Sequence, residues 1–416
     1  MSFSHSTQIA NFALIDAGLM ELGGHHVCMV DRICEGMQSK KLDHFEVFAH
    51  KALHPSIEQQ LIQSGVNVYR SFHTNFYQCF NEAGPLSKSD AYIAQLTEEL
   101  VAVYSKLALQ TNVVAFYPCA SWQHLIAIAM AAKLVKKRIK STECIVHVVC
   151  LMFNPGISFD GKSLNRQLQQ SYQLALQWLA KHKNVHVVAT DEEQQQAFQH
   201  VSSQRYALHP SYLENWQAIE NSHKTKPQQD NCDKERVLVY IGQAKENKGF
   251  CQIPQFLSNN IQHDKQQNLT RNYVVQFTCA GWEDEKVNQA VIEIKAIASQ
   301  YSCVKVYDQF LNEDQLKQEF LLANSMLFLY NAAEYQHKSS GVLWLASFYK
   351  LHVYVEMPSW ITREALRLGN RYTQLDNGLL PEQSSLSHSN TPAEQKTQYS
   401  QAIYADFWVW LDKLYR

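Results

Sequence analysis

Glycine and charge are both scarce in this sequence. Its 416 residues include only 14 glycines, about half of the usual usage. Charged residues make up 18%, the net charge is −2 and the sequence pI is near 6.8. This balance gives no electrostatic reason for a nucleic-acid partner, so small-molecule ligands are expected. Hydrophobic residues amount to 46%, which argues against a disordered chain.

Long apolar runs and secretion signals are also missing. No run approaches the ~18 apolar residues that a membrane-spanning helix needs. The first residues, MSFSHSTQIANFALIDAGLM, have no basic start before an apolar segment. The ten cysteines include no Cys-x-x-Cys pair and several lie inside apolar runs such as CIVHVVC, which is typical of reduced thiols. We therefore expect a cytoplasmic protein that is neither exported nor embedded in a membrane.

What the sequence does contain is a regular alternation of short apolar runs and helical patterns. Helical periodicity predicts helices over 89–109 and 165–183, for example. Continuous apolar strands joined by helices are typical of parallel sheets covered on both faces. The apolar runs predict strands at 44–50, 67–72, 112–118, 144–153, 184–190, 236–241, 273–280, 303–310, 325–331 and 351–357.

A polar segment divides the strands into two series. Residues 214–235, ENWQAIENSHKTKPQQDNCDKE, form the candidate linker. The sequence thus predicts two doubly wound α/β domains, with the ligand in the cleft between them at the carboxyl ends of the strands. The expected boundaries are an N-terminal domain at 1–218, a linker at 219–235, a C-terminal domain at 236–395 and a last segment at 396–416. The aromatic-rich helix expected at 398–416 should return to the N-terminal domain.

The segment RVLVYIGQAKENKGF, residues 236–250, places glycines and lysines directly after a strand. A glycine there lets backbone N–H groups approach an anion closely, and the next helix adds a favourable dipole. Lys245 and Lys248 bring positive charge beside Gly242 and Gly249. The pattern favours a bound phosphate or diphosphate; the alternative is a pair of ordinary turn glycines with solvated lysines.

Two more segments open helices in a similar way. Gly23 and Gly24 precede His25 and His26 in DAGLMELGGHHVCMV. In SMLFLYNAAEYQHKSSGVLWLASFYKLHVYV, the residues at 339–341, Ser-Ser-Gly, stand where a helix is expected to begin. Both offer N–H groups to an anion, and the second adds hydroxyl groups.

Taken in order, these segments resemble those of nucleotide-sugar glycosyltransferases of the GT-B fold, close to the retaining bacterial group. GGHH is similar to the family's N-terminal glycine-rich loop on the acceptor side. NVHVVATDEEQQQAF with YALHPSYL is similar to the strand, helix and strand that close its N-terminal domain. YIGQAKENKGFCQIPQFL resembles the start of the donor domain, and YQHKSSGVLWLASFYKLHVYV its donor-binding segment. The resemblance implies two Rossmann-like domains that face each other across a cleft.

The resemblance also implies roles for individual residues. Lys248 stands where the family has a lysine that meets the donor diphosphate. Expected catalytic residues are His25, Lys248 and Lys245, and expected acceptor-side residues are His26 and His124. The expected donor-binding residues are Gly23, Gly24, Gly242, Gln243, Gly249, Glu334, His337, Lys338, Ser339, Ser340 and Gly341. No metal and no cofactor are expected. His147, inside an apolar run, is interpreted as a core histidine.

The chain departs from the family pattern at several positions. Gln243 stands where an arginine is usual, and Lys245 is the candidate substitute. His337 and Leu345 stand where two glutamates are usual, the second of which binds the ribose. Lys350 and His352 replace a glycine and a proline. Glu334 or Glu356 is a candidate for the missing carboxylate.

The implied function is transfer of a sugar from a nucleotide diphosphate to a glycan or lipid-linked acceptor in bacterial surface polysaccharide biosynthesis, with retention and without a metal. A non-catalytic GT-B protein that binds a sugar nucleotide or a partner transferase is the alternative. An epimerase of this architecture would need paired acid/base carboxylates, and the sequence offers no convincing pair. The basic run KLVKKRIK at 133–140 is either a solvated helix end or a peripheral contact with anionic lipids.

Overall fold

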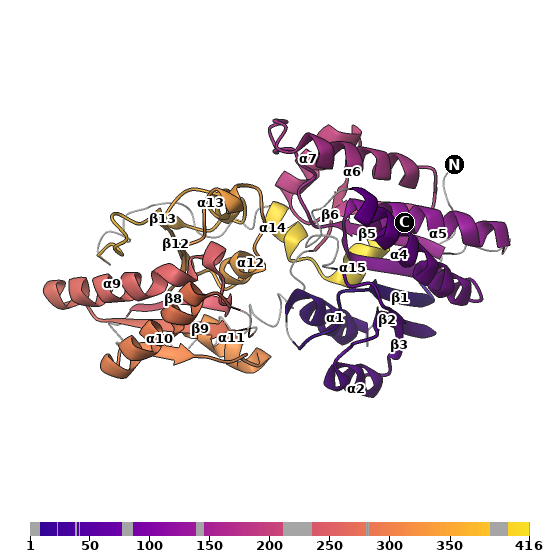
Figure 1. The fold of residues 1–416 in the computed structure, drawn as a ribbon. Helices are drawn as coiled ribbons and strands as arrows, with labels where there is room; N and C mark the ends of the chain where they lie inside the picture. Colours follow the sequence, from indigo (N-terminus) through magenta and orange to yellow (C-terminus); the bar gives the residue numbers. More distant parts are fainter. Residues whose placement is uncertain are drawn as a thin grey trace. The chain divides into compact units, whose positions relative to one another are not determined.

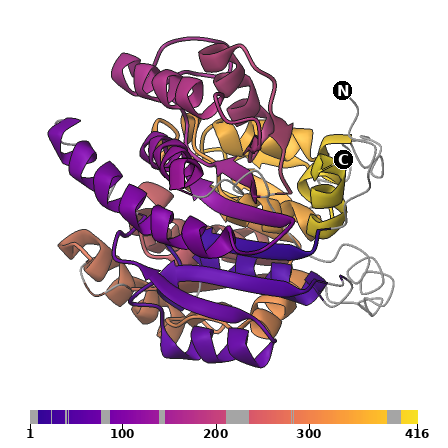
Figure 2. The same ribbon diagram turned by 90° about the vertical axis from the view of Figure 1, so that its right-hand side faces the viewer.

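The computed structural model describes residues 9–22, 24–37, 40, 42–76, 86–138, 145–210, 235–279, 281, 283–382 and 398–415. The chain divides into two compact units (Figure 1, Figure 2). The N-terminal unit comprises Met1–Asn215 and Ala402–Arg416, and the C-terminal unit comprises Trp216–Gln401. Except for Glu235, the expected linker at 219–235 lies outside the described residues.

The N-terminal unit is built on a seven-stranded parallel sheet in the order β3-β2-β1-β4-β5-β6-β7. Chain order runs outward in both directions from β1, so the topological switch point lies between β1 and β4. All six residues of β1 are buried, as expected for a central strand covered on both faces. The strands are β1 (Asn11–Asp16), β2 (His44–His50), β3 (Asn67–Phe72), β4 (Val113–Ala120), β5 (Ile145–Leu151), β6 (Val185–Ala189) and β7 (Ala207–Leu208).

Helices cover both faces of this sheet (Figure 1). Successive side chains of a strand point to opposite faces, and accordingly Ala13 and Ile15 belong to one apolar core while Phe12 and Leu14 belong to the other. The helices before the linker are α1 (Gly24–Met37), α2 (Pro55–Gln63), α4 (Leu86–Leu107), α5 (Trp122–Arg138), α6 (Arg166–Leu179) and α7 (Glu192–Ser202).

The end of the chain packs on the N-terminal unit. Trp408 is 1% exposed in the core that contains Phe12, and its indole N–H donates to the carbonyl of Ile33 at 3.1 Å. The indole N–H of Trp410 donates to the carbonyl of Leu208 at 2.8 Å. The prediction of a single helix at 398–416 is wrong, since α14 (Gln398–Ile403) and α15 (Phe407–Tyr415) are separate helices. The Asp406 carboxylate accepts a hydrogen bond from Val409 N and so caps the start of the second helix.

The C-terminal unit repeats the design with a six-stranded parallel sheet in the order β10-β9-β8-β11-β12-β13. Its switch point lies between β8 and β11. The strands are β8 (Glu235–Gln243), β9 (Arg271–Thr278), β10 (Val304–Tyr307), β11 (Ser325–Phe328), β12 (His352–Val355) and β13 (Tyr372–Gln374). The helices are α9 (Ile253–Gln267), α10 (Glu285–Gln300), α11 (Glu313–Leu322), α12 (Gly341–Phe348) and α13 (Trp360–Arg367), with short 3₁₀ turns η2 (Glu246–Lys248), η3 (Phe250–Gln252) and η4 (Glu334–Gln336).

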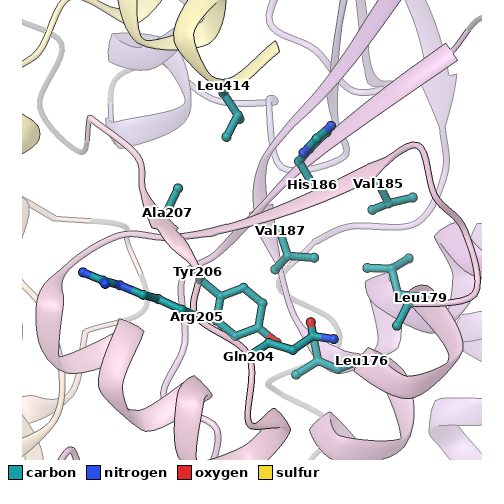
Figure 3. A pocket seen from close by; sticks show the side chains of 11 residues that line it. Leu176, Leu179, Val185, His186, Val187, Gln204, Arg205, Tyr206, Ala207 and Leu414 are labelled. Carbon is teal, nitrogen blue, oxygen red and sulfur yellow. The ribbon is translucent and has the colours of Figure 1, made fainter. Parts of the chain in front are cut away.

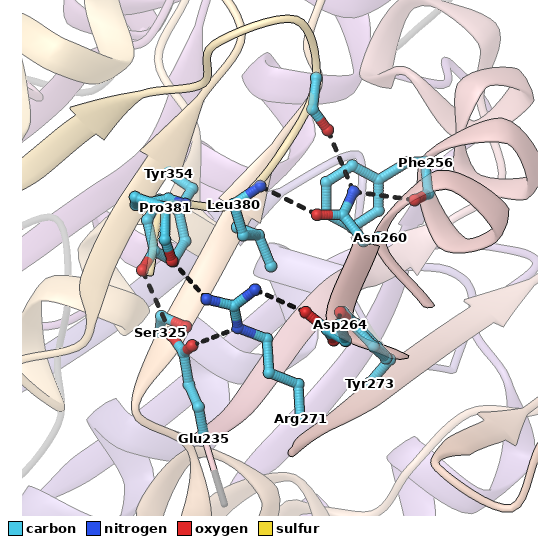
Figure 4. Close-up of polar contacts among 11 residues, drawn as sticks. Glu235, Phe256, Asn260, Asp264, Arg271, Tyr273, Ser325, Tyr354, Leu380 and Pro381 are labelled. Carbon is cyan, nitrogen blue, oxygen red and sulfur yellow. Dashed lines mark hydrogen bonds and ion pairs between the residues drawn. The ribbon is translucent and has the colours of Figure 1, made fainter. Parts of the chain in front are cut away.

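A buried polar network joins the amino ends of these strands (Figure 4). Arg271 Nε donates to Glu235 at 2.7 Å, and Arg271 Nη1 donates to Asp264 at 2.8 Å. The hydroxyls of Ser325 and Tyr354 also donate to Glu235. Because each buried charge has charged or polar partners, the network fixes the strands at the end of the sheet away from the carboxyl edge.

The prediction of two doubly wound α/β units is confirmed, and the sequence-based strand assignment is incomplete. The list of apolar runs lacks β1, β7 and β13, of which β7 alone is expected from the resemblance of YALHPSYL to a strand of the family. β1 has only four apolar residues between Asn11 and Asp16, and the other two are two and three residues long. No described helix is long and apolar enough to span a membrane.

Candidate functional site

The carboxyl ends of β8 and β11 carry the two loops that the sequence marked for anion binding. The strands are neighbours at the switch point of the C-terminal sheet, where a parallel α/β sheet opens a crevice for ligands. The loop after β8 supplies Lys245 and Lys248. The loop after β11 supplies Lys338 before α12. The fold therefore brings to one edge the residues that are about ninety positions apart in the chain.

Three lysines gather at this edge. Desolvation, together with repulsion from Lys245 and Lys338, lowers the pKa of Lys248 to about 8. The pKa of Lys245 is also lowered, by desolvation and by Lys338. Such mutual repulsion is unfavourable unless an anion offsets it. The three ammonium groups are thus arranged to meet a multiply charged anion.

The glutamates of these two loops have other partners than the lysine cluster. Glu246 forms its ion pair with Lys286 at 3.0 Å. Glu334 accepts a hydrogen bond from Asn247 Nδ2 at 2.9 Å. Within the described part of the chain, none of the lysines 245, 248 and 338 forms an ion pair with a carboxylate.

The glycines of the loop after β8 have backbone conformations that suit them to this place. Gly242 has φ 126° and Gly249 has φ 76°, both in the region that favours glycine. A Cβ built on Gly242 would stand 3.9 Å from Lys248 Nζ, so the lysine head lies over the glycine. Gly242 N donates to Gln276 Oε1 at 2.9 Å, and the carbonyl of Gln243 accepts from the Tyr240 hydroxyl at 2.5 Å. The main chain beside the lysines is held in one shape.

The loop after β11 is held by aromatic residues beneath it. Tyr335 is buried, its ring lies 4.4 Å from that of Tyr330, and Lys338 Nζ lies 5.1 Å from its ring centre. Ser340 is buried, precedes α12 without a capping hydrogen bond from its side chain, and lies 3.4 Å from the Tyr330 hydroxyl. A Cβ on Gly341 would meet no atom of the described residues within 4 Å. The start of α12 is therefore open next to the lysines.

Further expected or candidate donor-site residues of the C-terminal unit lie at the same edge, whereas Gly24 belongs to the N-terminal unit. His337 directly follows η4 and is partly exposed, and Ser339 is partly exposed beside Ser340. Glu356 is exposed directly after β12. Leu345 lies in the second turn of α12, partly buried, and its side chain has no hydrogen-bonding atom.

The N-terminal unit has its own polar cluster, at the switch point between β1 and β4. Asp16 ends β1, and His26 lies in the first turn of α1. His26 Nδ1 lies 2.7 Å from Asp16 Oδ2, with both side chains buried. Burial alone would raise the pKa of Asp16, but the charge and hydrogen bond of His26 hold it below its usual range. A Cβ on Gly18 would overlap the His26 ring, so only glycine fits there.

His25 and Cys119 complete this cluster. The His25 ring lies 4.1 Å from that of His26 and is tilted from it by 34°, and His25 Nε2 lies 3.6 Å from the Sγ of Cys119, near the end of β4. Desolvation and repulsion from His26 lower the pKa of His25 to about 3, although the residue keeps an exposed side. Burial raises the pKa of Cys119 well above its usual value. Both groups are therefore neutral.

The two remaining candidate histidines are buried among protein partners. His124 Nδ1 lies 2.7 Å from the Ser121 hydroxyl, and Nε2 lies 3.0 Å from the Tyr92 hydroxyl. His147 Nδ1 lies 3.2 Å from the Tyr117 hydroxyl. Desolvation lowers the pKa of each histidine to about 3. These contacts are those of core histidines.

Two site residues could have been found from the sequence but were not. Asp16 ends β1 and Cys119 is the last residue but one of β4, the two strands that flank the switch point, and a polar residue at such a strand end is a usual signal. Gly24 begins α1, whereas Gly23 lies outside the described residues.

A cavity of about 310 Å³ lies elsewhere in the N-terminal unit (Figure 3). It is formed at the amino end of β6 by Val185, His186 and Val187, with Arg205 and Leu414 among its other lining residues. The polar clusters lie at the carboxyl ends of strands, so this cavity belongs to neither of them.

Comparison with known proteins gives structural similarity without sequence similarity. No family model and no curated protein matches the chain. Among solved structures, the chain resembles the apo structure of OtsA at TM-score 0.53 and 10% identity, over 88% of each chain. The chain has the GT-B fold. A UDP-forming α,α-trehalose-phosphate synthase from Burkholderia xenovorans, in complex with glucose-6-phosphate, matches at TM-score 0.56 and 9% identity, over 97% of this chain and 99% of that chain. UDP-GlcNAc 2-epimerase from Methanocaldococcus jannaschii matches at TM-score 0.53 and 11% identity, over the same shares.

Proposed function

We propose that the protein is a glycosyltransferase that takes its sugar from a nucleotide diphosphate. The observation that carries the proposal is the cluster of Lys245, Lys248 and Lys338 at the switch point of the C-terminal sheet, where the pKa of Lys248 is lowered to about 8. A diphosphate offers the multiple negative charge that such a cluster needs. The GT-B fold is consistent with this donor, since similar structures are a UDP-forming synthase and a UDP-GlcNAc epimerase.

In the reaction we propose, the bond between the sugar C1 and the donor phosphate oxygen breaks, and a bond from C1 to the acceptor hydroxyl oxygen forms on the same face. The acceptor proton passes to the departing phosphate oxygen. The charge that develops on the leaving diphosphate is stabilised by Lys248, Lys245 and the N–H groups at the start of α12. These cations replace a metal in this role, so we propose a metal-independent, retaining transfer without a cofactor.

The acceptor side is proposed to lie in the N-terminal unit, with His25 and His26 as its polar groups. A glycan or lipid-linked acceptor, in bacterial surface polysaccharide biosynthesis, follows from the resemblance of the sequence. Lys133, Lys136 and Lys137 at the end of α5 would allow peripheral contact with anionic lipids. The protein is proposed to act in the cytoplasm, at or near the inner face of a membrane.

A donor screen tests the proposal. Purified protein is incubated with a panel of nucleotide-diphosphate sugars, with and without sugar, sugar-phosphate and lipid-phosphate acceptors, and products are followed by mass spectrometry. Release of a nucleoside diphosphate from at least one donor, with transfer to an acceptor, is expected. The absence of both hydrolysis and transfer over the panel, together with measurable donor binding, would favour the second candidate, a non-catalytic GT-B protein. Gln243, His337 and Leu345, which stand where relatives have an arginine and two glutamates, favour that candidate.

A further inference from the structure

His25, His26 and Cys119 lie close enough together to share one metal ion. Each offers one ligand atom, and these three atoms lie within 4.8 Å of one another. Two ligands of a single tetrahedral Zn²⁺, at about 2.0–2.1 Å for nitrogen and about 2.3 Å for sulfur, lie about 3.5 Å apart. His25 Nε2 and Cys119 Sγ, at 3.6 Å, already have this separation.

The surroundings of the cluster match those of a metal centre in two further respects. His26 Nδ1 is hydrogen-bonded to the buried carboxylate of Asp16 at 2.7 Å, and a carboxylate in this position orients a metal-binding imidazole and makes it a better ligand. The thioether of Met152 lies 3.5 Å from Cys119 Sγ, so the environment of the thiol is soft as well as buried. Imidazole and thiolate ligands select Zn²⁺ and similar cations over Mg²⁺ or Ca²⁺.

The cluster is also built by rigid parts of the fold. His25 and His26 lie in the first turn of α1, and Cys119 lies near the end of β4, the strand that pairs with β1 at the switch point. Gly18 lets the loop after β1 lie against the His26 ring. Only His25 is exposed, so one ligand can rotate to close the site while the other two stay in place.

We infer that His25, His26 and Cys119 form a binding site for a thiophilic divalent cation, Zn²⁺ being the ion that this set of ligands fits. Three protein ligands leave the fourth position of a tetrahedral ion to water or to an oxygen of a small molecule. The inference does not rest on the diphosphate site, which lies in the other unit, and its test does not use transfer activity.

Cobalt substitution tests the site directly. The purified full-length protein is stripped with a chelator and titrated with Co²⁺, which replaces Zn²⁺ and reports its ligands by absorption. The expected result is one equivalent of bound Co²⁺ with a thiolate-to-cobalt charge-transfer band and the intense visible bands of a tetrahedral ion, both removed by one equivalent of Zn²⁺. Cys119→Ser should abolish the charge-transfer band, and His25→Ala should weaken binding by at least tenfold.

A matched control lies on the same helix. Cys28 is exposed on α1 and is not part of the cluster, so Cys28→Ser should bind Co²⁺ as the unaltered protein does. Because His25 is exposed, His25→Ala is expected to fold even if Cys119→Ser does not, and circular dichroism checks both. Binding well below one equivalent, or an unchanged spectrum in His25→Ala and Cys119→Ser, would overturn the inference.

Discussion

Gly249 lies against the backbone carbonyl of Leu329 so closely that a Cβ at position 249 would overlap the carbonyl oxygen. Gly249 also directly follows η2 with φ 76°, a backbone conformation in which a side chain would be strained. Next to this contact, Asn331 N donates to the carbonyl of Asn247 at 3.0 Å. These contacts join the loop after β8 to the loop after β11, and so hold the lysines of both loops together.

Replacing this glycine should therefore destabilise the C-terminal unit. We expect Gly249→Ala to lower the free energy of unfolding by at least ~2 kcal/mol, because the strain of the left-handed backbone and the overlap with Leu329 both destabilise the folded state. The measurement is urea unfolding followed by circular dichroism. Gly341→Ala is the control, because a Cβ there meets no atom within 4 Å in the part of the chain that the structure describes. A loss in the control as large as that in Gly249→Ala would show that the contact with Leu329 is not the cause.

The fold could be predicted from the sequence where a strand or helix has a clear pattern of apolar and polar residues of its own. Strands β2 and β3 were predicted to the residue; β2, for example, is a mostly apolar run bounded by His44 and His50. β1 was not predicted, and only four apolar residues lie between its polar ends Asn11 and Asp16. Both polar ends are nevertheless buried, since Asn11 Nδ2 donates to the Thr111 carbonyl and Asp16 bonds His26. Such pairing depends on tertiary contacts that the pattern of one strand does not contain.

The candidate site was predictable only in its local parts. Lys245 and Lys248 share one loop, so their proximity follows from the sequence. Lys338 joins them because β8 and β11 are neighbours, which depends on the strand order of the sheet. In the same way, Cys119 lies near His25 across 94 positions of the chain because β4 pairs with β1. Contacts of this second kind require the topology.

The first functional prediction concerns Lys248. Lys248→Ala should reduce transfer by roughly 10²-fold or more, the scale seen when one charge-stabilising group is removed from a developing anion. The measurement is the kcat/KM of donor turnover for the donor found in the screen. Lys317→Ala is the matched control, because Lys317 pairs with Glu313 on the surface of α11. A rate in Lys248→Ala equal to that of the control would place the diphosphate elsewhere.

Donor affinity should also depend on pH in a defined direction. The pKa of Lys248 is lowered to about 8 by desolvation and by repulsion from Lys245 and Lys338. A bound diphosphate favours the protonated lysine and raises this pKa, so binding takes up a proton above about pH 8. Affinity should accordingly be constant just below that pH and fall as the pH rises through it.

Calorimetry with a nucleoside diphosphate from about pH 7 upward, where a terminal phosphate is already doubly charged, measures this dependence. Lys248→Arg is the control, since a guanidinium stays charged over the whole range. The decline should be smaller in this variant, with the remainder due to Lys245, whose pKa is also lowered. An affinity of the unaltered protein that does not change between neutral pH and about pH 9.5 would contradict a role for Lys248 in binding the diphosphate.

Lys350 gives a prediction about stability. It stands where the resembling family has a glycine, and it has φ 57° after α12. A lysine in this conformation lowers the free energy of unfolding by about 1–2 kcal/mol. A glycine would remove this strain, but part of the gain would be offset because glycine has more conformational freedom in the unfolded chain. Lys350→Gly should raise the thermal midpoint, with a net gain of up to about 1 kcal/mol. Lys350→Ala keeps the strain and should give no gain; equal midpoints in the two variants would show that the backbone conformation is not limiting.

The ribose of the donor should contribute little to binding. By the resemblance in sequence, Leu345 stands where the GT-B glycosyltransferases have a glutamate that binds the ribose, and a leucine cannot accept its hydrogen bonds. The missing charge-assisted hydrogen bond is worth about 1.5–3 kcal/mol, or about ten- to a hundredfold in affinity. With this loss of affinity, we expect calorimetry to give dissociation constants of about tens of micromolar or weaker for nucleoside diphosphates. Removal of the 2′-hydroxyl should change the affinity little.

Two variants make this prediction decisive. Leu345→Glu restores the carboxylate and should tighten binding of the ribonucleotide by about tenfold or more without a comparable gain for the 2′-deoxynucleotide. Leu345→Gln, of the same size but uncharged, should give a smaller gain. A large loss on 2′-deoxygenation in the unaltered protein would mean that another carboxylate holds the ribose. Glu356, exposed after β12, and Glu334, bonded to Asn247, are the candidates. Glu356→Ala and Glu334→Ala would then identify it, because only the variant that lacks this carboxylate would bind both nucleotides equally.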